Sequence, residues 1–352
     1  MKRFCFLLLS LLPVFGCFSS ARMATPTLTP VAVDEAAAYP SQDPGTKPPV
    51  LTGFTSLSKE LLDEGWVQLF DGVSTFGWQV TEGDGTLSVM SDGSQNYLVF
   101  DKKDHEQATI SHRICEAEMR FDNSGGSSNS ISRKGWTSPW SNAQWGATFS
   151  DGTIGGDIKL REGITEIRAK RSSRIQQLTE SDWKPVAGQC EAKWTDGVLE
   201  LTGGSGMLET VKEYGDFVLQ LEYFTEKGVN SGVFFRCIPG ENMNGYECQI
   251  FNSPPDDDYT KFIGTDTGGI FRRQVGRNVG PKDGEWNYLT IDAHGAVIAT
   301  WVNGIQVTDW TDTREEDQNP RNGKRLQPGT IQLQGHDPTT KILFRNFRIV
   351  EL

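Results

Sequence analysis

Two short alternating stretches constrain the fold of this sequence most: residues 230–237 and 246–252, separated by turn-forming residues. Hydrophobic side chains recur at every second position in both stretches, which is the pattern of half-buried β-strands. We therefore predict two adjacent antiparallel strands joined across residues 238–245.

The register of this strand pair decides which side chains share a face. With Arg236 opposite Glu247, the apolar face consists of Phe235, Cys237, Tyr246, Cys248 and Ile250. The polar face then consists of Phe234, Arg236, Glu247 and Gln249. A half-solvated sheet with a surface Arg–Glu pair would show the same pattern. The polar face is therefore a candidate site only if other strands add functional groups to it.

The rest of the chain also favours β-structure. Its 352 residues are 36% hydrophobic, which suits one large or two modest domains. Long apolar runs of helical period are absent, whereas short alternating runs and turn dipeptides recur. We therefore predict an all-β protein. The formal net charge of −12, without clusters of lysine and arginine, argues against nucleic acid as a partner.

The N-terminus has the layout of a bacterial secretory signal, with Lys2 and Arg3 before an apolar run over residues 4–14. The Gly16-Cys17 ending resembles a lipobox, which implies a signal peptide over residues 1–16 and a lipidated Cys17. We expect an exported protein, periplasmic or at the cell surface, that touches a membrane only through this anchor. Because Phe15 fits the lipobox poorly, plain secretion is the alternative. Residues 17–53 are rich in proline and predict a disordered tether.

An exported protein can form disulfide bonds. Cys115, Cys190, Cys237 and Cys248 follow Cys17 in the chain. The register above places Cys237 and Cys248 diagonally on one face, so a disulfide between them is predicted, with free buried thiols as the alternative. No Cys/His spacing fits a zinc site.

A weak internal repeat predicts two tandem β-sandwich copies. Residues 153–168 resemble the end of the chain at residues 329–349. We place a shortened first copy at residues 54–172 and a fuller second copy at residues 173–352. In the second copy, Asn303-Gly304 marks a hairpin across residues 297–307.

The polar faces of the predicted strands in the second copy supply acid, base and amide groups. The candidate residues are Glu222, Arg236, Glu247, Gln249, Gln332, Gln334 and His336, with Asn230 and Ser231 in the loop before a strand. Carboxylates, an imidazole, a guanidinium and amides on one sheet suit a polyhydroxylated ligand or acid–base chemistry. Trp301 is a candidate platform for a sugar ring, with a packed aromatic as the alternative.

Short motifs of the chain carry a family resemblance. They are Leu69-Phe70-Asp71-Gly72 with Gly77-Trp78, Asn230-Ser231-Gly232, Tyr246-Glu247-Cys248-Gln249, Gly284-Glu285-Trp286-Asn287, Val302-Asn303-Gly304, Gln332-Leu333-Gln334-Gly335-His336 and Phe344-Arg345-Asn346-Phe347. Together they resemble the 3-keto-disaccharide hydrolase domain family, mainly over residues 190–352. The resemblance implies a concanavalin-like jelly-roll sandwich, and a site in the second copy only.

The resemblance also implies a substrate, a glycoside whose C3 hydroxyl has been oxidised to a ketone. Such a ketone acidifies the C2 proton and makes the C1 oxygen a leaving group. We expect Glu247 as the base and His336 or Glu222 as the acid. Arg236, with Gln249 or Asn230, would contact the oxyanion and the sugar.

Other functions stay open. A divalent metal held by a carboxylate and the histidine is compatible with these residues, although no spacing demands one. A two-carboxylate glycosidase using Glu222 and Glu247, and a non-catalytic carbohydrate-binding module, are the alternatives.

Overall fold

The computed structural model describes residues 29–32, 49–91, 93–102, 108–113, 117–121, 131–132, 142–154, 157–170, 174–188, 190–258 and 266–352. The expected signal peptide, Cys17, most of the expected tether and Cys115 lie outside the described residues. Within the described ranges, no helix has the length and apolarity needed to cross a membrane.

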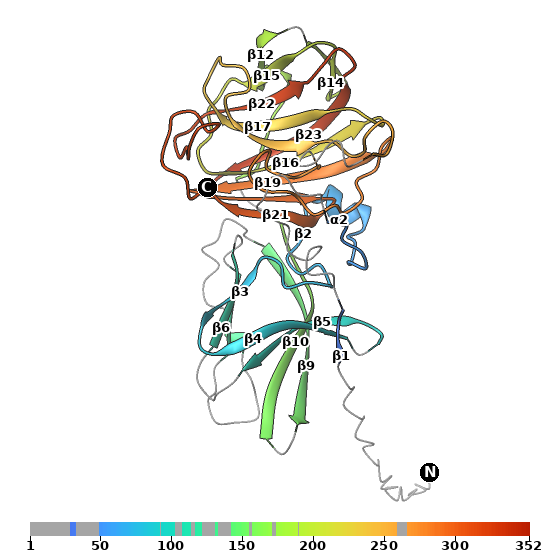
Figure 1. Ribbon diagram of the computed structural model, residues 1–352, viewed down its shortest axis with the longest axis vertical. Coiled ribbons are helices and arrows are strands. Elements are labelled where there is room, and N and C mark those ends of the chain that lie inside the picture. The colour runs from blue at the N-terminus through green and yellow to red at the C-terminus, as the bar shows by residue number, and fades with distance from the viewer. Residues whose placement is uncertain are drawn as a thin grey trace, which may run out of the picture.

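Residues 174–352, the C-terminal unit, form a sandwich of two antiparallel sheets (Figure 1). The larger sheet has the order β13-β14-β23-β16-β19-β20-β21, with β11 beside β23. Its strands are β11 (Gln176–Gln177), β13 (Glu191–Thr195), β14 (Val198–Thr202), β16 (Phe217–Thr225), β19 (Trp286–His294), β20 (Val297–Val302), β21 (Ile305–Thr311) and β23 (Lys341–Glu351). The smaller sheet has the order β12-β15-β22-β17-β18. Its strands are β12 (Trp183–Gly188), β15 (Gly206–Thr210), β17 (Ser231–Cys237), β18 (Tyr246–Ile250) and β22 (Thr330–Gly335), and a 3-10 turn, η1 (Glu180–Asp182), precedes β12.

Alternation along the strands builds the core between the two sheets. Phe217, Leu219 and Leu221 of β16 point inward to meet Val233 of β17 and Leu333 of β22 in one buried cluster. The all-β jelly-roll sandwich predicted from the sequence is confirmed. So is the hairpin of β20 and β21, whose turn residues Asn303 and Gly304 have φ of 50° and 79°.

Residues 78–170, the N-terminal unit, form most of two further antiparallel sheets, shown below the sandwich in Figure 1, and two short strands from earlier in the chain join one of these sheets. One sheet contains β1 (Thr29–Pro30), β4 (Gly85–Ser91), β5 (Asn96–Lys102), β10 (Asp157–Lys170), β2 (Val67–Gln68) and β9 (Asn142–Ile154). The other contains β3 (Trp78–Glu82), β6 (Ala108–His112), β7 (Ala117–Phe121) and β8 (Ile131–Ser132). The N-terminal unit thus has a two-sheet build of its own.

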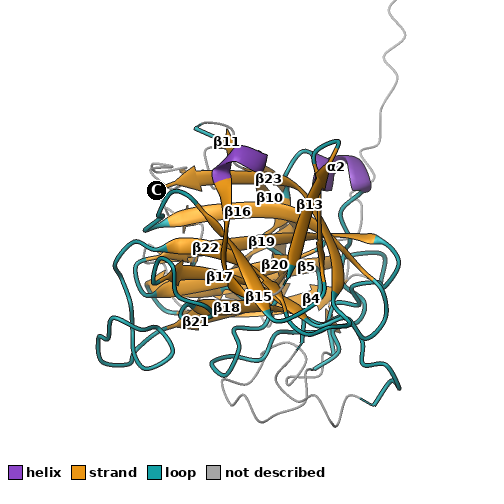
Figure 2. Ribbon diagram, turned by 90° about the horizontal axis from the view of Figure 1, so that it is seen from above, coloured by secondary structure: helices purple, strands orange, loops and turns teal. Residues whose placement is uncertain are grey.

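Residues 49–77, the connecting segment, precede the N-terminal unit in the chain and contact both units: β2 pairs with β10, whereas other residues of the segment pack on the C-terminal unit. Leu51 and Val73 belong to the core of the sandwich. The short helix α2 (Lys59–Asp63) of this segment lies at the edge of the strand layers (Figure 2). A buried ion pair joins Asp71 to Arg277 across 2.8 Å. The sandwich is therefore completed by residues that precede the N-terminal unit.

Trp301 lies where the two units meet. It is fully buried, and its Nε1 donates a hydrogen bond to the carbonyl of Gln68 at 3.1 Å. It shares a second hydrophobic cluster with Trp78 and Phe100 of the N-terminal unit and Ala299 of β20. The prediction of Trp301 as a sugar platform is therefore wrong, because its ring is enclosed by the packing of the two units.

The central strand pair, β17 and β18, is antiparallel as predicted, but its register differs. Phe234, not Arg236, lies opposite Glu247. Arg236 has a φ of 49°, and the pairing of β17 with β22 shifts between Phe234 and Cys237. This β-bulge exchanges the expected faces of Arg236 and Cys237.

The bulge explains why the predicted disulfide is wrong. Cys237 packs with Phe234 and Met207 on the outer face of the smaller sheet, whereas Cys248 belongs to the core between the sheets. Both thiols are free. Two sulfur atoms on opposite faces of a sheet cannot reach bonding distance without moving the backbone.

Candidate functional site

A pocket of about 390 Å³ opens on the outer face of the smaller sheet. Its lining residues are Ser205, Asn230, Met243, Glu247, Gln249, Phe271, Arg321, Gln334 and His336. Five of these were predicted from the sequence, and the structure brings them together from β18, from β22 and the loop after it, and from the loop before β17. We take this pocket as the candidate site.

The floor of the pocket is the sheet itself. Glu247 and Gln249 project from β18 and Gln334 projects from β22. Gly232 of β17 lies between these strands, and a Cβ there would stand 3.1 Å from Glu247 Oε1. A glycine at this position therefore leaves the carboxylate room to lie flat on the sheet.

Glu247 is the one carboxylate among the lining residues, and only 5% of its surface is exposed. Arg321 Nη2 donates a hydrogen bond to its Oε2 at 2.9 Å. Burial raises the pKa of Glu247 above its ordinary value, while Arg321, His336 and Arg272 act in the opposite direction. The result is a carboxylate that holds its proton more strongly than an exposed glutamate, which makes it a better base once ionised.

Arg321 was not predicted. It lies in the irregular segment 312–325 between β21 and β22, where no periodicity distinguishes a functional side chain from a solvated one. Its guanidinium stands over the rings of Phe234 at 5.0 Å and Phe271 at 5.5 Å, and its Nε donates to the carbonyl of Met243 at 3.0 Å. These contacts hold a cation against Glu247, a role the sequence analysis had given to Arg236.

His336 lies at the rim, just after β22. Its Nδ1 is 2.8 Å from Asp337 Oδ2, and its Nε2 is 3.4 Å from the amide nitrogen of Asn230. Gln249 Nε2 in turn donates to Asn230 Oδ1 at 2.7 Å. A carboxylate on one ring nitrogen orients the imidazole, so its other nitrogen faces the amides of the pocket.

Two predicted binding residues serve the frame of the site instead. Ser231 is buried and its Oγ donates to the carbonyl of Gln334 at 2.8 Å, which ties β17 to β22. Gln332 is fully buried, with its Nε2 2.9 Å from the carbonyl of Glu241 and 3.3 Å from Glu209 Oε2. The loop that contains Glu241 therefore covers Gln332. Neither Ser231 nor Gln332 lines the pocket.

The prediction that Glu222 and Arg236 share one sheet face with Glu247 is wrong. Glu222 belongs to β16 of the larger sheet and projects from its outer face, so the core of the sandwich separates it from Glu247. It is bound by Arg345, whose Nη2 is 2.7 Å away. Arg345 itself lines another pocket, of about 790 Å³, beside α2. Glu222 does lie on the polar face of its strand, as predicted, but alternation within a strand does not reveal which sheet the strand joins.

Arg236 is fully buried at the end of the sandwich. Its guanidinium donates to Asp216 Oδ1 at 2.7 Å and to the carbonyls of Gly215 and Gly295 at 3.1 and 2.6 Å. These three acceptors lie beside strands of the larger sheet, so Arg236 joins the two sheets, and a fourth acceptor is the carbonyl of Arg325 at 3.1 Å. It contributes nothing to the lining of the pocket.

The pocket offers little to a metal ion. Among the described residues, no three His, Cys, Asp or Glu side chains come together as ligands. Among the described residues that line the pocket, Glu247 and His336 are the only His, Cys, Asp or Glu side chains that an ion could bind. Most structural and catalytic sites use three or more protein ligands.

Gln334 is the residue of the floor that is best placed to recognise a hydroxyl group. It is only 4% exposed, and its Oε1 has no hydrogen-bond partner in the described part of the chain. A buried acceptor without a partner costs free energy that a ligand hydroxyl can recover. Gln334→Leu is expected to weaken sugar binding about 10- to 100-fold. Isothermal titration with a sugar ligand measures this.

Gln332→Leu is the matched control for Gln334. Gln332 lies two positions before Gln334 on the same face of β22, and its Oε1 also lacks a described hydrogen-bond partner. The loop above Gln332, however, keeps a ligand away from it. Equal losses of affinity in the two variants would contradict a direct contact between Gln334 and the ligand.

Asp266 supports the turn that carries Phe271. It is buried, its Oδ2 accepts from the backbone nitrogen of Gly276, and burial raises its pKa to about 7. The folded protein therefore favours the protonated form of Asp266. The stability that this protonation contributes is fully present below about pH 3.9, the ordinary pKa of an aspartate, and is lost as pH rises through 7. Asp266→Asn should remove a destabilisation on the order of 4 kcal/mol at pH 8 relative to pH 4. Urea unfolding at both pH values measures it, and equal pH dependence in both proteins would contradict it.

Residues 176–350 match the sequence profile of a family described as the 3-keto-alpha-glucoside-1,2-lyase-like domain. The match covers β11 to β23, and therefore both sheets of the sandwich and every residue that lines the pocket. The C-terminal unit belongs to this family. It therefore has a carbohydrate-related fold of the glycosyl hydrolase-like or carbohydrate-binding kind.

Solved structures similar to the 3-keto-alpha-glucoside-1,2-lyase-like domain include two putative glycosyl hydrolases from Parabacteroides distasonis. One is 28% identical, covers 48% of this chain and 99% of its own, and has a TM-score of 0.37. The other is 22% identical, covers 49% and 90%, and has a TM-score of 0.40. A carbohydrate-binding module, CBM66 from Bacillus subtilis, is 14% identical, covers 47% and 93%, and has a TM-score of 0.33. The search of curated proteins found no match.

Proposed function

We propose that the pocket around Glu247 cleaves 3-keto-glycosides by acid–base chemistry next to the ketone. The observation that carries the proposal is a buried carboxylate of raised pKa on a sheet face, paired with Arg321 and within a pocket that also contains an imidazole. The family to which the C-terminal unit belongs supports the choice of substrate. A base, an acid and a cation are the three groups that this reaction needs.

In the proposed reaction Glu247 removes the proton from C2 of the oxidised sugar. The electron pair of the C2–H bond moves into the C3 carbonyl to give an enolate, which forms a C1–C2 double bond and restores the ketone as the C1–O bond breaks, and His336 gives a proton to the departing oxygen. Arg321 stabilises negative charge that develops on the C3 oxygen, which is the task first assigned to Arg236. Elimination alone yields an unsaturated keto sugar, and addition of water across the new double bond completes a net hydrolysis.

The positions of the side chains favour this mechanism over a two-carboxylate glycosidase. That alternative paired Glu222 with Glu247, and the core of the sandwich separates the two. A retaining or inverting glycosidase needs both carboxyl groups within about 10 Å across one bond. Glu247 is the one acidic residue among those that line the pocket.

Non-catalytic sugar binding is the second candidate function. The amides of Asn230, Gln249 and Gln334 with the ring of Phe271 form a set that suits a sugar without any chemistry. For either function we also propose that the protein is exported and anchored to a membrane through a lipid on Cys17.

The deciding experiment incubates the purified protein with 3-keto-trehalose, 3-keto-lactose and their unoxidised parents, with and without EDTA. Mass spectrometry identifies the products, and the reaction in D₂O shows whether deuterium enters C2. We expect cleavage of the keto sugars only, with C2 exchange. Cleavage of the unoxidised parents would contradict the mechanism, and binding without exchange or product would favour the second candidate.

A further inference from the structure

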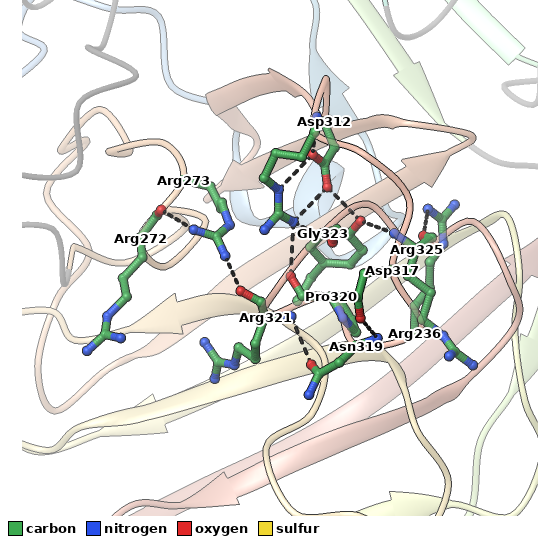
Figure 3. A network of polar contacts seen from close by, with 12 residues as sticks. Arg236, Arg272, Arg273, Asp312, Asp317, Asn319, Pro320, Arg321, Gly323 and Arg325 are labelled. Atoms are coloured by element: carbon green, nitrogen blue, oxygen red, sulfur yellow. Dashed lines mark hydrogen bonds and ion pairs between the residues drawn. The ribbon is translucent and has the colours of Figure 1, made fainter.

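Residues 312–325, here called the strap, connect β21 to β22 without regular structure of their own and carry Arg321 to the pocket. Figure 3 shows the polar contacts that hold the strap. Arg321 is attached to its surroundings on both sides. Its carbonyl accepts from Arg273 Nη2 at 2.8 Å, and its backbone nitrogen donates to Asn319 Oδ1 at 2.9 Å.

Asp312 anchors the start of the strap. It is buried and receives two hydrogen bonds from Arg314, Nε to Oδ1 at 2.9 Å and Nη2 to Oδ2 at 2.8 Å. The same Arg314 Nη2 lies 2.9 Å from the carbonyl of Pro320 and 2.7 Å from that of Gly323. These bonds reach the residues on either side of Arg321, so the Asp312–Arg314 pair shapes the part of the strap that contains it.

One hydroxyl joins both ends of the strap. Tyr246 Oη donates to Asp312 Oδ2 at 2.8 Å and accepts from the backbone nitrogen of Arg325 at 2.8 Å. Tyr246 immediately precedes Glu247 on β18, with its ring in the core and the carboxylate of Glu247 on the outer face. The strand that carries the carboxylate therefore also holds the segment that carries its cation.

We propose that Tyr246 and Asp312 are positioning residues that keep Arg321 paired with Glu247 during the reaction. The proposal rests on the proposed function only in assigning the base to Glu247. Without the Tyr246 hydroxyl, both ends of the strap lose a hydrogen bond, so the strap holds Arg321 less firmly beside the carboxylate. If Tyr246 had a purely structural role, Tyr246→Phe would lower the stability of the protein but would not change the pairing of Arg321 with Glu247.

The ionisation of Glu247 reports on this pairing. The charged and titratable groups that act on it are Arg321 of the strap, His336 after β22 and Arg272 beside Phe271. Moving Arg321 away removes the largest of the favourable interactions and leaves the other two in place. The pKa of Glu247 should therefore rise when Tyr246 loses its hydroxyl, and the acidic limb of any activity profile should move to higher pH by the same amount.

The test uses the full chain with ¹³C-labelled glutamate, and NMR follows the titration of Glu247, assigned by its loss in Glu247→Gln. Arg321→Met is expected to raise the midpoint by about 1 unit. Tyr246→Phe should raise it by a measurable part of that shift, and Asp312→Asn should do the same if the tyrosine variant folds poorly. In the Arg321→Met background, Tyr246→Phe should add nothing, because the cation through which it acts is gone.

Tyr223→Phe is the matched control, since Tyr223 is equally buried and its hydroxyl binds Asn252, away from the pocket. It should lower stability without moving the Glu247 midpoint. An unchanged midpoint in both Tyr246→Phe and Asp312→Asn, or an equal shift with and without Arg321, would overturn the proposal. The titration does not depend on turnover. If the Glu247 midpoint shifts as expected in the variants but the protein cleaves no keto sugar, the result counts against the proposed function and not against the positioning role.

Discussion

Replacing Glu247 by glutamine is expected to lower the rate of keto-glycoside cleavage by about 10³-fold while the protein stays folded. A glutamine of the same shape fills the space beside Gly232 but cannot accept the C2 proton. General bases contribute on the order of 10²- to 10⁴-fold, and Glu247 is the one carboxylate of the described pocket lining. Steady-state kinetics and deuterium incorporation at C2 measure the loss.

Glu209→Gln is the control for this experiment. Glu209 is also buried on the outer face of the smaller sheet, but its Oε2 binds Thr330 Oγ1 at 2.9 Å and it does not line the pocket. Its replacement should lower stability and leave turnover nearly unchanged. Turnover retained in Glu247→Gln, or lost equally in both variants, would refute the assignment of the base.

Arg277→Met is expected to destabilise the protein by about 3–5 kcal/mol. Arg277 Nη1 pairs with Asp71 Oδ2 at 2.8 Å, its guanidinium also binds the carbonyl of Gln306, and both charged groups are buried. Removing the cation leaves the Asp71 carboxylate buried beside Ser74 without a charged partner. Chemical denaturation followed by tryptophan fluorescence measures the change.

The double variant Arg277→Met with Asp71→Asn tests the cause. With no unpaired charge left, it should lose less stability than the two single changes added together. Lys59→Met serves as a control for an exposed pair, since its 2.7 Å contact with Asp63 is screened by solvent and should contribute far less to stability than the buried pair. Strict additivity in the double variant would show that the buried pairing is not the source of the loss.

The pairing of Asp71 with Arg277 also explains a motif that lies within residues 54–172, the predicted first copy. Leu69-Phe70-Asp71-Gly72 lies far ahead of the segment that matches the family profile, which begins at residue 176. Yet Asp71 and Val73 pack against the C-terminal unit. A fragment that begins at residue 176 would lack these contacts, because the connecting segment supplies part of the core.

The sequence alone determined the all-β class, the strand pair at residues 231–250 and five residues of the pocket. The reason is that alternation at period two is a local property, so it can be read wherever one face of a strand is buried. Glu247 and Gln249 on β18, and Gln334 on β22, were placed on the outer face correctly for this reason.

Only the tertiary structure decided which faces meet. The extra residue of a β-bulge exchanged the sheet faces of Arg236 and Cys237. Arg236 therefore lies away from the pocket, and Cys237 cannot form the predicted disulfide with Cys248. The placement of β16 in the larger sheet moved Glu222 to the other side of the core, and an irregular strap supplied Arg321. Bulges, sheet membership and strap conformation depend on contacts between residues far apart in the chain, and local periodicity contains no record of such contacts.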